Sequence, residues 1–168
     1  MILFRIHLDN FYCQAFLRIF GSLMQNDQNK FQYLGLKRIL LAAFVFMTVG
    51  TVLELYLLDH YEGVQQLIPI LCIGTSILTL IVLFFRKTNL TLKLFKSVLV
   101  LTALSGVYGA FLHLLANYEF EQEMKPTARG WDLFVESLSG ALPTLAPFSM
   151  IVLALIGYSY VILIKQKR

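Results

Sequence analysis

Charged side chains are scarce in this chain. Asp, Glu, Lys and Arg make up 14% of its 168 residues, whereas soluble domains carry roughly a quarter. Apolar residues make up 58%, and the mean hydropathy is +0.71. The apolar residues form long blocks and do not follow the spacing of an amphipathic helix or strand. This pattern predicts an integral membrane protein whose main solvent is lipid.

Cysteine is scarce too, and its scarcity excludes several classes of protein. The chain has two cysteines, Cys13 and Cys72, and no C-x-x-C pair. A disulfide scaffold, a zinc ribbon and a dithiol redox centre are therefore not expected. The sequence also lacks a nucleotide-binding loop and a Ser/His/Asp set. These absences favour a non-catalytic protein over an enzyme. No signal peptide is expected, because polar residues interrupt the apolar start of the chain.

Four apolar blocks are each long enough to cross a bilayer. They cover about residues 39–58, 64–85, 97–115 and 141–164. A helix of about 20 residues is ~30 Å long, which matches the hydrocarbon thickness. The sequence therefore predicts an all-α, four-helix transmembrane bundle spanning residues 38–168.

Glycine and proline positions predict how two of these helices pack. Ser105 with Gly109, and Gly106 with Ala110, are two overlapping pairs of small residues that would let another helix approach closely. Pro143 and Pro147 lie in the first third of the fourth block and predict a kink there.

Two segments outside the blocks carry amphipathic patterns. Residues 1–37 form a separate N-terminal segment, in which Leu8 to Leu23 predict a helix lying in the membrane interface. An alternative is that this segment is an extension and the working start is Met24. The long loop 116–140 begins with a glutamate-rich stretch. Its second half predicts a short amphipathic helix on the membrane surface, whose apolar face comprises Trp131, Phe134, Val135 and Leu138.

The lysines and arginines predict the orientation. Twelve lie in the N-terminal segment to Arg38, the loop 86–96 and the C-terminal tail, and only Lys125 and Arg129 lie in the two other connections. The positive-inside rule then puts both termini in the cytoplasm, and we expect a bacterial cytoplasmic membrane. The net charge of +4 follows from this topology and does not indicate nucleic-acid binding.

This topology gathers histidines and carboxylates at the extracytoplasmic end. Imidazole and carboxylate ligands suit zinc, iron or copper, so the sequence suggests a transition-metal site. A haem is disfavoured because one of the two histidines falls in a turn. The alternative is that these groups cap helices, bind water and pair with the nearby basic residues. The predicted ligands are His60, Glu62, His113 and Glu119, supported by Glu54, Asp59 and Asn117.

Three functions remain open on the sequence alone. The first is a non-catalytic accessory or scaffold subunit that holds a membrane-protein partner, or a second copy, through its acidic rim or its small-residue helix faces. The second is a metal-binding enzyme or carrier with a His/carboxylate site on the extracytoplasmic face. The third is an oligomeric transporter of a small solute or protons. In all three, membrane lipid surrounds the protein.

Overall fold

The computed structural model describes residues 31–127 and 130–165, and every described element is a helix. Four helices are long and apolar enough to cross a membrane: Phe31–Leu57, Val64–Phe85 (α2), Asn89–Met124 (α3) and Phe148–Lys165 (α5). A shorter helix, α4, covers Trp131–Leu138. The all-α prediction with four apolar helices is confirmed. The expected interfacial helix over residues 8–23 lies outside the described part.

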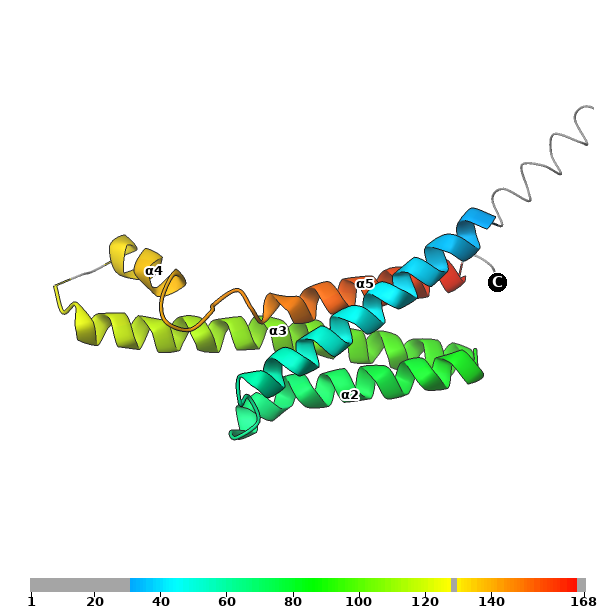
Figure 1. The fold of residues 1–168 in the computed structure, drawn as a ribbon, viewed down its shortest axis with the longest axis horizontal. Coiled ribbons are helices and arrows are strands. Elements are labelled where there is room, and N and C mark those ends of the chain that lie inside the picture. Colours follow the sequence, from blue (N-terminus) through cyan, green and yellow to red (C-terminus); the bar gives the residue numbers. More distant parts are fainter. Residues whose placement is uncertain (1–30, 128–129, 166–168) are drawn as a thin grey trace, which may run out of the picture. The chain divides into compact units, whose positions relative to one another are not determined.

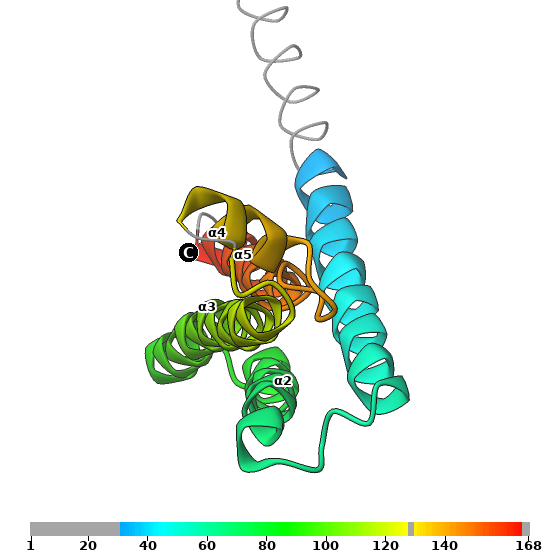
Figure 2. The same cartoon turned by 90° about the vertical axis from the view of Figure 1, so that its left-hand side faces the viewer.

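The chain divides into two units between Ile39 and Leu40. The second unit, from Leu40 onward, contains α2, α3, α4 and α5. Within it, α3 packs against α2, α4 and α5 (Figures 1 and 2). The division into segments 1–37 and 38–168 stays a prediction.

Both α2 and α3 are capped locally at their first turns. The Gly63 N–H donates to Gln66 Oε1 (2.8 Å) at the start of α2. At the start of α3, Thr88 Oγ1 accepts from the Thr91 N–H (3.1 Å). Such caps satisfy backbone N–H groups that have no partner inside the helix. The bounds of α2, Val64–Phe85, are those predicted from the sequence.

Helix α3 is longer than predicted. It has 36 residues, so it is ~54 Å long against ~30 Å of hydrocarbon. The loop predicted over residues 86–96 is helical from Asn89 onward. The prediction that residues 116–124 are loop is also wrong. Glutamate, glutamine and methionine are good helix formers, and they continue α3 through this stretch. About 24 Å of α3 therefore exceeds the thickness of a bilayer core.

The core lies where α3 meets α5 and residues 40–57. Phe95 and Leu153 are fully buried there, and the Phe44 and Phe95 rings meet edge to face with centroids 5.9 Å apart. Gly157 of α5 has no side chain, and an added Cβ would lie 2.7 Å from Leu99 Cδ2 and 2.8 Å from Phe44 Cε2. A glycine is needed at this crossing because larger residues would separate the helices.

The fourth spanning helix begins later than predicted. Residues 141–147 are not helical, and α5 starts at Phe148. The expected kink at Pro143 and Pro147 is therefore a break, because two closely spaced prolines remove the N–H groups a helix would need. Pro147 packs on the small-residue pairs of α3: a Cβ on Gly106 would lie 2.7 Å from the Pro147 carbonyl oxygen. The close approach predicted for these pairs is made by the same chain.

Candidate functional site

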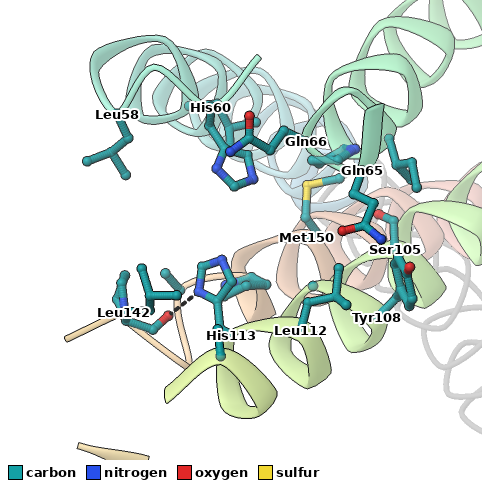
Figure 3. A pocket seen from close by; sticks show the side chains of 18 of the residues that line it. Leu58, His60, Gln65, Gln66, Ser105, Tyr108, Leu112, His113, Leu142 and Met150 are labelled. Carbon is teal, nitrogen blue, oxygen red and sulfur yellow. Dashed lines mark hydrogen bonds between the residues drawn. The ribbon is translucent and has the colours of Figure 1, made fainter. Parts of the chain in front are cut away.

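A cavity of about 690 Å³ lies between residues 51–69, one face of α3 and the segment 141–150. It is at the end of the unit that carries the turn 58–63. Figure 3 shows His60 and His113 pointing toward one another from opposite walls, with Gln65 and Tyr108 farther along the cavity. Its lining is mainly apolar, with a small number of polar side chains, as is usual for binding sites.

The turn 58–63 holds His60 at the cavity wall. The His60 N–H donates to the Leu55 carbonyl (2.9 Å). Asp59 has a positive φ of 51°, a conformation that Asp tolerates better than most residues. Its Oδ1 accepts from the Tyr61 hydroxyl (2.9 Å), and this hydrogen bond raises the pKa of Tyr61. Asp59 thus serves the geometry of the turn.

His113 reaches the cavity from α3 and has a fixed orientation. Its Nδ1 lies 3.1 Å from the carbonyl oxygen of Pro143. A carbonyl oxygen only accepts hydrogen bonds, so the proton is on Nδ1 and Nε2 carries a free lone pair. The rings of His60 and His113 have centroids 6.1 Å apart and planes inclined by 66°. Two imidazoles far apart in the sequence are therefore in contact.

The surroundings of His60 favour its neutral form. Burial, and secondly the neighbouring His113, lower the pKa of His60 from its ordinary value. Both effects disfavour the imidazolium: burial removes water from the charge, and a second imidazole close by would repel it once protonated. A neutral imidazole has a nitrogen lone pair available for a ligand.

The other predicted ligands do not join this pair in a common cluster. All three predicted glutamates are exposed; Glu54 and Glu119 line the same cavity, whereas Glu62 is not part of its lining. Within residues 31–127 and 130–165, no three His, Cys, Asp or Glu side chains are arranged to hold a metal ion. Of the four ligands predicted from the sequence, the structure brings two together, His60 and His113.

Asn117, predicted to support the metal site, is the centre of a buried clasp. It is 1% exposed, and its Nδ2 lies 2.8–3.0 Å from three acceptors: the Ser137 and Leu142 carbonyls and Thr144 Oγ1. Its Oδ1 accepts from the Leu142 N–H (2.9 Å). The amide has two protons for three acceptors, so one proton is shared. The clasp holds the non-helical segment before α5 on α3 and thereby positions Pro143, the partner of His113.

Gly140 is required by the same clasp. An added Cβ at this position would lie 2.6 Å from Asn117 Cγ. The sequence analysis placed Asn117 one turn from His113 but missed the clasp. Pro143 and Pro147 were the signal in the sequence for such a clasp. They stop the helix, so the backbone N–H and C=O groups beside them need hydrogen-bond partners outside a helix.

Two residues of the cavity wall, Tyr108 and Leu112, were not indicated by the sequence. They line the cavity together with Ser105 and with Glu119, one of the predicted ligands. These residues recur at spacings of three to seven, so they lie on one side of α3. In the sequence these residues form a stripe along one face of α3, and the stripe continues past residue 115, the predicted end of the third span.

Comparison of the chain with family models, with curated proteins and with solved structures finds no match. Its function therefore has to be argued from the geometry of the cavity.

Proposed function

We propose that this chain is an integral membrane protein that binds a transition-metal ion through His60 and His113. The observation that carries the proposal is the contact of the two imidazoles at the cavity wall, with His113 oriented by Pro143. Metal-bound histidines commonly donate their second N–H to a backbone carbonyl, which fixes the tautomer and directs the other nitrogen to the ion.

The spacing of the two rings supports one shared ion. Imidazole nitrogens bonded to the same ion at ~2.0–2.1 Å place their ring centroids roughly 5 to 6.5 Å apart. The observed separation is 6.1 Å. With two protein ligands, the ion keeps open coordination positions for water or for a bound molecule, as sites that act on a ligand require. Zinc and copper are the ions best suited to such a pair of imidazoles.

The side of the membrane follows from charge. If lysine and arginine mark the cytoplasmic side, both termini lie inside and the turn 58–63 lies outside. The ion would then exchange with the extracytoplasmic solution. This orientation supports a role in holding or delivering metal at the outer face of a bacterial cytoplasmic membrane.

Elemental analysis of the purified protein tests the proposal. Full-length protein in mild detergent, exposed to zinc or copper and then dialysed, should retain one ion per chain. His60→Ala and His113→Ala should each lose the ion. The chain's third histidine provides a matched control, so His7→Ala should retain it. Equal metal content in wild type and the double variant His60→Ala/His113→Ala would falsify the proposal.

A second candidate is the accessory subunit, and it is supported by the projecting end of α3. This end and α4 together form a helical pair that exposes Phe120, Met124 and Trp131 by 49%, 66% and 73%. Large exposed apolar side chains on a part of α3 beyond the thickness of a bilayer core favour an interaction surface. The small-residue pairs of α3 offer no alternative, because Pro147 of the same chain covers them.

Copurification from native membranes tests this second candidate. Trp131→Ser should release a partner that the wild type retains. Phe85→Ser is a matched control. Phe85 is exposed to a similar degree (79%), but it is the last residue of α2 and belongs to neither α3 nor α4. The accessory role is wrong if no stoichiometric partner accompanies the wild type, or if both variants retain it equally.

A further inference from the structure

The cavity is far larger than a metal ion needs. Its volume of about 690 Å³ falls in the range of sites that hold organic ligands, roughly 300–1,000 Å³. Most of its wall is apolar, and Leu55, Leu58, Ile68, Leu112 and Met150 all contribute to it. An organic molecule with an apolar body therefore fits the bulk of the space.

The charges of the lining decide what kind of molecule this is. Glu54 and Glu119 both line the cavity, and no lysine or arginine among residues 31–127 and 130–165 does. An anionic headgroup would be repelled here, since it would find carboxylates and no cation. A cation is attracted, and the attraction is stronger than in water because apolar walls lower the local dielectric.

The uncharged polar groups of the wall also suit a cation. Pro69 lines the cavity and has no N–H, so the Gln65 carbonyl, one helical turn earlier, lacks its usual helical donor. Carbonyl oxygens present partial negative charge. Tyr108 adds an aromatic ring to the same wall, and aromatic faces attract organic cations. Figure 3 shows Gln65 and Tyr108 on the same side of the cavity, away from the two histidines.

We infer that the cavity binds a lipophilic organic cation. Its apolar body packs against the leucines and Met150, and its charge is balanced by Glu54 and Glu119. This site goes beyond the metal site, because it uses the carboxylates and the inner wall and does not require His60 or His113 as ligands. The two sites can therefore be tested separately.

A pair of ions with the same shape and opposite charge tests the inference. Tetraphenylphosphonium and tetraphenylborate differ in sign but hardly in size. Each is titrated by equilibrium dialysis into metal-free, full-length protein in nanodiscs of phosphatidylcholine, and binding to empty nanodiscs is subtracted. We expect saturable binding of about one tetraphenylphosphonium per chain and no saturable binding of tetraphenylborate.

Isosteric variants identify the carboxylates that matter. Glu54→Gln/Glu119→Gln should weaken tetraphenylphosphonium binding by about tenfold or more, because each carboxylate contributes directly to the cation's attraction. The matched control Glu62→Gln/Glu123→Gln changes two carboxylates that are exposed and outside the lining, and should bind as the wild type does. Size-exclusion profiles and melting temperatures confirm that each variant is folded.

Several results would overturn the inference: saturable binding of both ions alike, absence of saturable phosphonium binding, or an equal loss in both double variants. The experiment also separates the two sites. His60→Ala/His113→Ala should lose metal and keep phosphonium binding, whereas Glu54→Gln/Glu119→Gln should keep metal. Loss of one kind of binding thus leaves the other proposal standing on its own data.

Discussion

The compact unit has two ends that differ in how the same helices pack. At the end with Phe44, Phe95 and Gly157, side chains fill the space between helices, and a single added methyl group would collide with its neighbours. At the end with the turn 58–63, the helices enclose a cavity of about 690 Å³ lined by histidines and glutamates. Packed interiors seldom leave large voids without a reason.

The difference lies in what holds each end together. The filled end depends on apolar contact between side chains. The hollow end depends on polar contacts: the Asn117 clasp, the bond from His113 to Pro143 and the turn bond from His60 to Leu55. Polar contacts fix positions without filling space, so an open site can be kept in a fixed shape. This comparison leads to four predictions.

The largest effect is expected at the filled end. Phe95 is completely buried, so Phe95→Ala leaves a void and should lower the free energy of unfolding by about 3–5 kcal/mol. Leu112→Ala removes a side chain that already lines the cavity and should cost well under half as much. Chemical denaturation in detergent measures both variants. Equal losses would show that the cavity is as tightly packed as the core.

The next largest effect is expected at the clasp. Asn117→Ala removes four hydrogen bonds, two of them buried and two partly buried, and leaves the Leu142 N–H and carbonyl without their partner, so unfolding should become easier by about 2–4 kcal/mol. Metal retention should fall too, because Pro143 no longer holds His113. Ser139→Ala is the control, since its hydroxyl bonds only within an exposed helix end. If Asn117→Ala is destabilised but retains its metal, the clasp is not needed to position His113.

The sequence predicted the helices better than their ends. Long apolar blocks give a strong signal in the sequence, and it was enough to identify the four helices that are long and apolar enough to cross a membrane. The end of α3 was missed because lipid preference stops near Leu115 while helix propensity continues to Met124. The start of α5 was missed because Asn117, 25 residues before Leu142, supplies hydrogen bonds to the non-helical segment that precedes α5.

The candidate site was predicted in part for a related reason. Topology alone brings His60 and His113 to the same end of the helices. His60 lies just before α2, and α3 runs back alongside α2 and reaches His113 after about as many residues as α2 contains. Which side chains then turn toward each other depends on local geometry. The positive φ at Asp59 and the carbonyl of Pro143 decide this, and neither follows from hydropathy or charge.

A smaller effect is expected from pH. The folded chain holds the pKa of His60 below its ordinary value, so the unfolded chain takes up a proton more readily. Metal-free protein should therefore lose stability as the pH falls below about 6.5, until folded His60 is itself protonated. His60→Asn should flatten this part of the profile while Glu54, Glu119 and His113 stay in place. Thermal unfolding between pH 7.5 and pH 5 gives both profiles, and identical slopes would contradict the burial of His60.

The smallest effect is expected where α4 meets the end of α3. Lys125 Nζ lies 3.0 Å from Glu136 Oε1 and 3.7 Å from Glu121 Oε2, and the hydrogen bond to Glu136 is the main reason that the pKa of Lys125 is raised. Lys125 is exposed, so water and salt screen the pair and Lys125→Met should hardly change the melting temperature. Hydrogen exchange in α4 should nevertheless become faster at low salt, because this ion pair ties α4 to α3. Lys93→Met, which changes an exposed lysine far from α4, should leave that exchange unchanged. If the two variants exchange alike, the buried contacts of Leu133, Ser137 and Asn117 are enough to hold α4 in place.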